Sequence, residues 1–257
     1  MTAAEHRHRK TREDAPAGFF EAEAAGLRWL GEAESRGGAR TVRVLDVGTR
    51  HIDLERLDPA QPTAPHAEAL GRALARTHAA GAPAFGAPPD GWSGAAWIGR
   101  QSQSNDPTPT WGLFYAEQRV RPFVRRALER GHLDPDGARV VERACDRLAA
   151  GDFDDDRPPA RIHGDLWSGN VVHTAQGAVL IDPAAHGGHG LTDLAMLDLF
   201  GCPGLDRVVA AYAEEAGLAP GWHGLVPLHQ LHPLAVHAAS HGPSYAAPLV
   251  DAARPFT

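Results

Sequence analysis

Three polar side chains in the middle of the sequence have types and a spacing that suit chemistry on a phosphate group. Asp165 and Asn170 flank LWSG within RIHGDLWSGN, and Asp182 follows the apolar run AVLI. The segment between them predicts two short strands that turn at Gln176 and Gly177, and adjacent strands would bring Asn170 close to Asp182. Carboxylate and amide oxygens are hard ligands that suit Mg²⁺. We therefore predict a magnesium site at Asn170 and Asp182, which leaves Asp165 for another task.

The order of these three residues also points to phosphoryl transfer. That reaction requires cations on the phosphate oxygens and an acidic group that orients the attacking hydroxyl. In protein kinases a catalytic Asp precedes a metal-binding Asn by five residues, and a second metal-binding Asp follows a strand later. Asp165, Asn170 and Asp182 match this pattern. The alternative is an ordinary turn in which Asp and Asn bond their own backbone, which would explain each residue but not all three spacings.

The elements that must position these residues follow from hydrophobic periodicity. Helical spacing predicts helices at residues 18–33, at 65–80, twice within 111–150, and over most of the chain from 192. Alternation predicts an antiparallel pair of strands in residues 41–48 and 51–57, joined through Gly48. Residues 81–110 are rich in glycine, proline, serine and asparagine, which predicts a long loop. Since strands and helices do not alternate, we expect an α+β fold with two lobes.

Composition limits the class of protein. The 257 residues suit one large domain or two modest ones, and the net charge of −7 argues against nucleic acid or an anionic membrane as a partner. Cys145 and Cys202 are too far apart in sequence to suggest a metal site or a disulfide framework. The N-terminal segment MTAAEHRHRKTRED lacks the apolar core of a signal peptide, and no run is long enough to span a membrane. We expect a cytoplasmic protein.

Two further residues stand out near the N-terminus. Lys10 is the only lysine in the chain. Glu23 lies three residues after Phe20 and four before Leu27, which places a carboxylate on or beside the apolar stripe of the first predicted helix. A buried carboxylate is costly unless it is paired, so Glu23 is expected to have a partner.

HGDLWSGN, followed by IDPAA and TDLAMLDLFG, resembles the fructosamine kinase or ketosamine-3-kinase family. This family is a branch of the protein-kinase-like fold and is related to aminoglycoside phosphotransferases. PAGFFEAEAAGLRWL, WGLFYAEQRVRP and LHQLHPLAVHA agree with the same resemblance, which covers residues 10–250. It implies a two-lobed protein-kinase-like fold, with a small N-terminal lobe at residues 1–57 and a larger, mainly helical C-terminal lobe at 58–257.

The resemblance implies ATP- and Mg²⁺-dependent phosphorylation of a ketosamine hydroxyl on fructosamine or ribulosamine, as part of deglycation repair. Asp165 is then the catalytic base, and Asn170 and Asp182 are the magnesium ligands. Lys10 contacts the α and β phosphates of the nucleotide and pairs with Glu23. The substrate is a small-molecule or glycated-protein ketosamine, and a monomer is expected.

Other roles follow from the same resemblance. Glu55, Arg56 and Leu57 form the segment between the lobes, where backbone groups meet adenine. Trp167 either stacks on the sugar adduct or fills the core behind the loop. Asp193, in TDLAM, holds the catalytic loop from a helix rather than touching the substrate.

The sequence also departs from the family pattern. The small lobe of a kinase begins with two strands joined by a glycine-rich loop, and the nine residues before Lys10 contain none. EHRHR lacks the apolar alternation expected of the strand that carries the lysine. We therefore expect a truncated N-terminal lobe and weakened nucleotide binding. Gly190 and Leu191 replace the family's charged pair before Asp193, which predicts looser anchoring of the catalytic loop.

Three other functions remain open. A kinase-like binding protein with weak or no activity would fit the missing glycine-rich loop. An aminoglycoside- or choline-type phosphotransferase would use the same Asp and Asn residues. A metal-dependent phosphoesterase would need ligands that converge on a metal, and its candidates are His163, His173, His186 and His189. Otherwise His163 braces the loop by hydrogen bonding, and His232 and His237 are ordinary helix residues.

Overall fold

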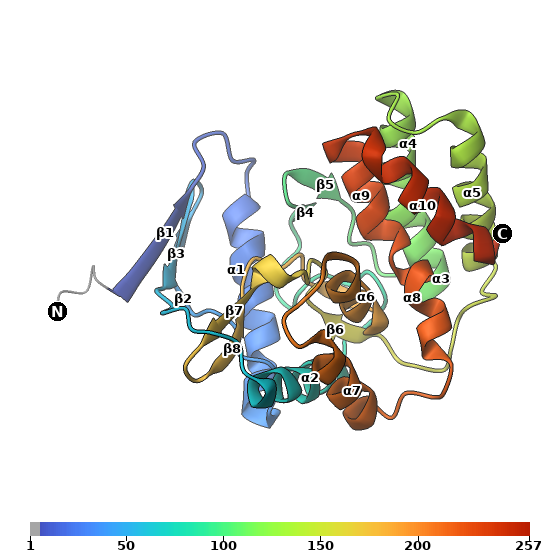
Figure 1. The fold of residues 1–257 in the computed structure, drawn as a ribbon. Helices are drawn as coiled ribbons and strands as arrows, with labels where there is room; N and C mark the ends of the chain where they lie inside the picture. The colour runs from blue at the N-terminus through green and yellow to red at the C-terminus, as the bar shows by residue number, and fades with distance from the viewer. Residues whose placement is uncertain (1–5) are drawn as a thin grey trace.

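The N-terminal part of the chain is a small antiparallel sheet with a helix beside it, as the computed structural model of residues 6–257 shows (Figure 1). The strand order is β1-β3-β2, so β1 lies at an edge of the sheet. The strands are β1 (Arg7–Thr11), β2 (Val44–Gly48) and β3 (His51–Glu55). Helix α1 (Phe19–Gly31) continues into a 3₁₀ turn, η2 (Glu32–Arg36). The predicted pair of strands and the predicted first helix are confirmed.

Strand β1 forms although its sequence lacks apolar alternation, so the expectation from EHRHR is wrong. Its register places Lys10 opposite Ile52 and Arg9 opposite Asp53. The Asp53 side chain is fully buried and pairs with Arg9 Nε at 2.6 Å and Arg7 Nη1 at 3.0 Å. Because Arg7 and Arg9 are both held by Asp53, charge pairing takes the place of the missing apolar residues on that face of the strand.

Helix α1 packs against the sheet through an apolar cluster. Phe20, Ala24 and Leu27 contact Ile52 and Leu54, and all five are buried. This packing fixes the position of the α1 residues between Phe20 and Leu27, including Glu23, relative to the sheet.

Two antiparallel strand pairs hold the segment from Arg161 to Asp182. Strand β6 (Ala160–Ile162) pairs with β9 (His186–Gly188), and β7 (Val171–Thr174) pairs with β8 (Gly177–Leu180). The predicted hairpin is thus confirmed. Leu180 also exchanges backbone hydrogen bonds of 2.9 Å with Arg40 and Val42. This contact ties the hairpin to the N-terminal sheet, and the two lie next to each other in Figure 1.

The rest of the chain is mainly helical, as predicted. The helices are α2 (Ala64–Ala79), α3 (Trp111–Phe114), α4 (Arg121–Glu129), α5 (Pro135–Ala149), α6 (Leu191–Phe200), α7 (Leu205–Ala216), α8 (Val226–His229), α9 (Leu231–His241) and α10 (Ala246–Ala253). A π-helical segment, η3 (Tyr115–Val120), joins α3 to α4. The predicted long loop at 81–110 contains a short hairpin of β4 (Ala96–Ile98) and β5 (Gln101–Gln103). In the part of the chain described, no helix has the length and apolar character needed to cross a membrane.

Candidate active site

The predicted site residues line two adjoining clefts. The first, of about 450 Å³, lies between α1 and the loop that carries Asp165. The second, of about 440 Å³, lies on the other side of Lys10 and Asp182, which line both. The predicted residues in the first cleft are Lys10, Glu23, Asp165, Trp167, Asn170 and Asp182. The predicted residues in the second are Lys10, Glu55, Arg56, Leu57 and Asp182.

Lys10 forms the centre of an ion-pair triad. Its Nζ lies 2.8 Å from Glu23 Oε1 and 2.8 Å from Asp182 Oδ1. Burial alone would lower the pKa of Lys10, but the charges of Glu23 and Asp182 outweigh it and raise this pKa. Glu23 thus has the partner that its place on the helix required. The triad brings together three residues from β1, α1 and the segment after β8.

Asp182 has an unusual backbone conformation. It is the one non-glycine residue with a positive φ, +54°, in the part of the chain described. An L-residue in this region costs about 1–2 kcal/mol, so the contacts around it must hold the conformation. Its carboxylate meets Lys10, and its carbonyl lies 3.4 Å from Asn170 Nδ2. Strain of this kind is typical of functional sites.

Asn170 holds both the backbone and the side chain of Asp165 in position. Its Nδ2 donates to the Asp165 backbone oxygen at 2.8 Å and to Asp165 Oδ2 at 3.3 Å. Because Nδ2 is turned toward these oxygens, Asn170 Oδ1 points away from them. Burial, with smaller contributions from Asp182 and Asp193, raises the pKa of Asp165 to about 7. A carboxyl group with a pKa near neutrality is suited to proton transfer.

Asp193 on α6 anchors the loop that carries Asp165. Its two carboxylate oxygens accept hydrogen bonds from the backbone nitrogens of His163, at 2.7 Å, and Gly164, at 2.9 Å. His78 Nε2 lies 3.1 Å from the same carboxylate, and His78 Nδ1 lies 2.7 Å from the Tyr212 hydroxyl. Burial would raise the pKa of Asp193, but the bond from His78 and its neighbours lower it overall. The anchoring contact predicted for Asp193 is present.

Gly190 does not loosen this anchoring, contrary to expectation. A Cβ atom at Gly190 would lie 2.4 Å from the Tyr212 hydroxyl and 2.6 Å from His78 Nδ1. The glycine therefore makes room for the His78–Tyr212 contact, which in turn supports Asp193.

His163 braces the loop as predicted. Its ring is fully buried, with Nε2 2.8 Å from the Ile181 oxygen, while Asp165 N donates to Nδ1 at 3.3 Å. The Nε2–H tautomer satisfies both contacts, and burial lowers the pKa of His163, which favours this neutral form. The ring links the backbone before Asp165 to the backbone before Asp182.

Trp167 is exposed rather than buried. Its side chain is 42% exposed and lines the first cleft. Of the two roles left open for Trp167, filling the core is therefore excluded.

The segment Glu55–Leu57 borders the second cleft. Glu55 Oε1 accepts hydrogen bonds from Arg40 Nη2 and Arg43 N, both at 3.0 Å, and Arg56 N donates to His6 O at 2.9 Å. The Glu55 side chain is thus engaged outside the cleft. The apolar lining of the second cleft consists of Val42, Leu54, Leu57, Pro59, Val172 and Ile181. These side chains form an apolar slot suited to a flat ring, and charged or polar residues, among them Lys10 and Asp182, line the rest of the cleft.

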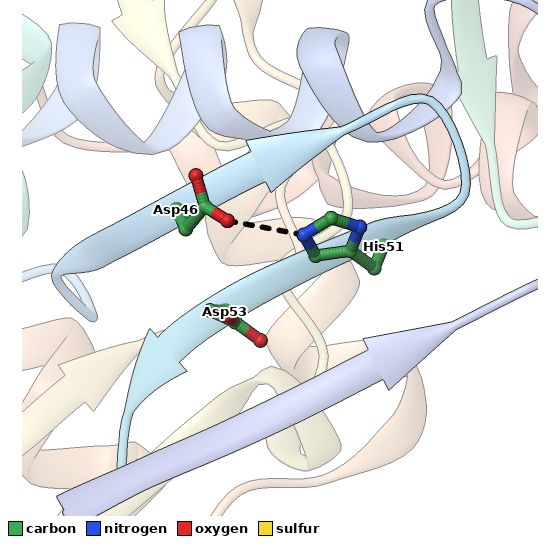
Figure 2. Close-up of side chains that lie close together, drawn as sticks. All are labelled: Asp46, His51 and Asp53. Atoms are coloured by element: carbon green, nitrogen blue, oxygen red, sulfur yellow. Dashed lines mark hydrogen bonds and ion pairs between the residues drawn. The ribbon is translucent and has the colours of Figure 1, made fainter. Parts of the chain in front are cut away.

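The histidines considered for a phosphoesterase do not converge on a metal site. His186 Nδ1 contacts the Ala184 oxygen at 2.7 Å, and His189 Nε2 contacts Asp155 at 3.2 Å. Within residues 6–257, the ligand atoms that do come together belong to Asp46, His51 and Asp53 on the N-terminal sheet (Figure 2).

The Asp46–His51–Asp53 group is an ion-pair network of the sheet. His51 Nε2 lies 3.1 Å from Asp46 Oδ2, as Figure 2 shows. Asp53 is already paired with Arg7 and Arg9, and its remaining attraction for a cation is small. The group lines neither cleft.

Sequence reasoning missed the wall of the first cleft opposite α1. Trp92, Trp97, Arg100 and Asn105 line it, and Phe19 faces the same cleft from α1. Most of them come from the 81–110 region, where no periodicity marks a side chain as facing a site. The abundance of tryptophan there was the one available signal.

Comparison with known proteins agrees with this geometry. The sequence model of the family described as fructosamine kinase matches residues 3–253. The chain belongs to the fructosamine kinase family. A Synechocystis protein described as a probable ketoamine kinase is 32% identical over 236 residues, which cover 88% of this chain and 75% of that protein.

Solved structures extend the comparison. A crystal structure described as a fructosamine-3-kinase from Thermobifida fusca is 49% identical, with a TM-score of 0.88, and the match covers 96% of this chain and 84% of that one. A choline/ethanolamine kinase family protein from Mesorhizobium loti is 16% identical with a TM-score of 0.58, and the match covers 98% and 88%. The second likeness concerns the fold alone. As a member of the fructosamine kinase family, the chain is a phosphotransferase with a protein-kinase-like α+β fold.

Proposed function

We propose that this fructosamine kinase family member transfers the γ-phosphate of ATP to a hydroxyl group of a ketosamine, such as fructosamine or ribulosamine, in deglycation repair. The observation that supports this best is the triad in which Lys10 Nζ lies 2.8 Å from both Glu23 and Asp182, in the same cleft as Asp165. The ammonium group of Lys10 is suited to positioning phosphates. Asp165 lies in the same cleft, and its pKa of about 7 suits a general base.

The nucleotide is proposed to span the two clefts. Its adenine would occupy the apolar slot of the second cleft, against Val42, Leu54 and Ile181, with the backbone of residues 55–57 at the edge. Its phosphates would then reach Lys10, which lines both clefts. Glu23 would keep the ammonium group in place, since both oxygens of this buried carboxylate accept hydrogen bonds from Lys10 Nζ.

The donor set around Asp182 fits Mg²⁺. Asn170 uses its amide nitrogen for internal hydrogen bonds, which leaves Oδ1 available, and Asp182 Oδ2 has no partner within residues 6–257. An amide and a carboxylate oxygen are hard ligands of the kind that Mg²⁺ takes together with phosphates and water. We propose Asn170 and Asp182 as its ligands. Bound Mg²⁺ would neutralise charge on the phosphate oxygens.

Asp165 is proposed to orient the acceptor hydroxyl and to accept its proton. The hydroxyl oxygen forms a bond to the γ-phosphorus, and the bond from that phosphorus to the β–γ bridging oxygen breaks. ADP leaves with the bonding electrons, and the proton resides on Asp165. Asn170 and His163 keep the carboxyl group in position for this step.

The acceptor is proposed to lie in the first cleft, against the exposed indole of Trp167. Both small ketosamines and glycated side chains of proteins would be candidates for an open cleft of this kind. A cytoplasmic location is proposed because ATP is supplied there and both cysteines, Cys145 and Cys202, are free.

An ATP-consumption assay with fructosyl-lysine tests the proposal. We expect turnover that requires Mg²⁺ and is lost in Asp165→Asn. Nucleotide binding without turnover of any sugar amine would favour a kinase-like binding protein. Phosphorylation of an aminoglycoside or choline, with no turnover of ketosamines, would favour a phosphotransferase of another specificity. Phosphate release from a phosphoester without ATP would contradict a kinase altogether.

A further inference from the structure

The loop after β5 is clamped to the π-helical segment η3 and reaches the first cleft. Gln118 Oε1 accepts a hydrogen bond from Asp106 N at 2.9 Å, and Gln118 Nε2 donates to Asp106 O at 2.8 Å and Thr108 Oγ1 at 2.9 Å. Asn105, in the same loop, lines the cleft that contains Asp165. The clamp therefore fixes the loop on which Asn105 is carried.

Arg119 lies beneath this loop as a buried cation. Its side chain is fully buried, with Nη1 donating to Ser104 O at 2.6 Å and Nη2 donating to Asn105 Oδ1 at 2.6 Å. The guanidinium carbon also lies 4.5 Å from the centre of the Phe114 ring. Burial lowers the pKa of Arg119 to about 9.

The burial of Arg119 is costly. Among the described residues Asp106 attracts it only from beyond ion-pair distance, and its Nε has no hydrogen-bond partner. A buried charge without a paired counterion is unfavourable, so the hydrogen bonds from Arg119 to Ser104 and Asn105 are the contacts that compensate it. The π-helical turn that carries Arg119 belongs to a class of distortion common at functional sites.

The bond to Arg119 fixes the orientation of the Asn105 amide. A guanidinium group only donates hydrogen bonds, so the atom facing it must be the carbonyl oxygen and not the nitrogen. Asn105 Nδ2 consequently faces the other way. It has no partner in the described part of the chain, and it is absent from the buried unpartnered atoms, so it is open to solvent.

We propose that Asn105 binds the acceptor by donating hydrogen bonds from Nδ2 to its oxygen atoms, and that Arg119 is the positioning residue that holds the amide in this orientation. The ligand class is a polyhydroxylated molecule with an apolar face. Phe19 and Trp97, whose ring centroids lie 5.5 Å apart, supply the matching aromatic wall of the cleft. This inference rests on the proposed function, because a ketosamine is such a molecule.

Asn105→Asp is the most informative variant. It keeps an oxygen for Arg119 but removes both N–H donors. Loss of one neutral hydrogen bond to the acceptor should raise the acceptor KM by about 3- to 10-fold, with the ATP KM and kcat changed by less than about twofold. Asn105→Leu removes both functions and should raise the acceptor KM at least as much. An acceptor KM within about twofold of wild type in both variants would overturn the proposal.

The positioning role of Arg119 is tested through coupling. Arg119→Met should raise the acceptor KM, and combining it with Asn105→Leu should add little further, because residues that act through each other are not additive. Fully additive effects would show that Arg119 acts independently of Asn105. If Arg119→Met does not fold, the two Asn105 variants still decide the main assignment.

Gln118→Met is the matched control. Gln118 clamps the same loop but does not line the cleft. A rise in acceptor KM equal to that of Asn105→Asp would assign the effect to loop position and overturn the role of the amide. A smaller rise in acceptor KM in Gln118→Met than in Asn105→Asp supports the assignment, because this variant keeps the amide and loosens only the loop.

Binding separates this inference from the proposed function. Trp92, Trp97 and Trp167 line the cleft, so quenching of tryptophan fluorescence by fructosyl-lysine reports occupancy without catalysis. Binding that weakens in Asn105→Asp, with no turnover in wild type, would refute the ketosamine kinase and keep the Asn105 assignment. Turnover of fructosyl-lysine, with binding that neither Asn105 variant changes, would support the ketosamine kinase and refute the Asn105 assignment. Failure of wild type to bind fructosyl-lysine at all would overturn both.

Discussion

Lys10 and Asp182, 172 positions apart in the sequence, meet at 2.8 Å between Nζ and Oδ1. Lys10 comes from an edge strand, and Asp182 follows the hairpin β7–β8. Glu23 completes the contact from α1, so the sheet, the helix and the hairpin all converge on one ammonium group. Because Lys10 is the only lysine of the chain, its chemistry can be followed without interference from other side-chain amines.

Amine-selective labelling should therefore report nucleotide binding directly. The Lys10 side chain is 27% exposed, and we expect slow modification that saturating ATP reduces several-fold. The modified position is read by mass spectrometry after digestion, with the α-amino group as an internal reference. In Lys10→Arg only the α-amino group should react. Equal labelling of Lys10 with and without ATP would contradict the placement of phosphates beside it.

Removal of the Lys10 charge should damage the site more than the fold. Lys10→Met leaves Glu23 buried without its cation, and we expect a stability loss of about 1–3 kcal/mol in urea unfolding. The ATP KM should rise and kcat should fall together, since the same ammonium group holds phosphates and Asp182. Lys10→Arg keeps the charge and should retain more of the stability than of the activity. A Lys10→Met variant with wild-type kinetics would rule out the nucleotide role.

Asp165 gives the reaction a defined dependence on pH. Burial raises its pKa to about 7, and a general base works only in the ionised form. The value of kcat/KM should therefore fall as pH drops through about 7 and level off above it. Asp165→Asn should lower kcat by about 10²- to 10⁴-fold and abolish the fall of kcat/KM at low pH. A wild-type profile that stays flat from about pH 6 to about pH 8 would mean that Asp165 is not the group that titrates.

The sequence predicted the residues of the triad and the loop better than the elements that carry them. Asp165, Asn170 and Asp182 are adjacent in a loop and a hairpin, so local spacing was enough. Strand β1 was missed because ion pairs from Asp53, in a different strand, replace the apolar alternation that marks a strand. Asn105 was missed for a similar reason, since its orientation depends on a bond from Arg119 that only tertiary structure reveals.

Gly190 should be intolerant of even one added methyl group. A Cβ atom there would approach the Tyr212 hydroxyl to 2.4 Å, and overpacking of this kind costs about 1–3 kcal/mol. Gly190→Ala should therefore lower stability and, through His78 and Asp193, also lower kcat. Gly224→Ala is the control, because a Cβ atom there meets nothing within 4 Å and φ is not positive. Equal stability of the two variants would show that the His78–Tyr212 contact relaxes without cost.

The buried histidines of the helical part should make the fold sensitive to acid. His186, His229 and His232 are fully buried, and burial holds the pKa of each well below the usual 6.5. The folded chain keeps them neutral, whereas the unfolded chain protonates them below about pH 6.5, so the unfolded state binds more protons there. Stability is then greatest above that pH and decreases as the pH falls, by up to about 1.4 kcal/mol per pH unit for each histidine.

Urea unfolding at about pH 7.5 and about pH 5.5 measures this loss. His186→Asn should reduce the slope of stability against pH, because its side chain can still contact the Ala184 oxygen but does not titrate. His6→Asn makes the same substitution at an exposed position and serves as the matched control. A free energy of unfolding that is the same at both pH values would mean that these three rings are protonated, or already hydrated, in the folded state.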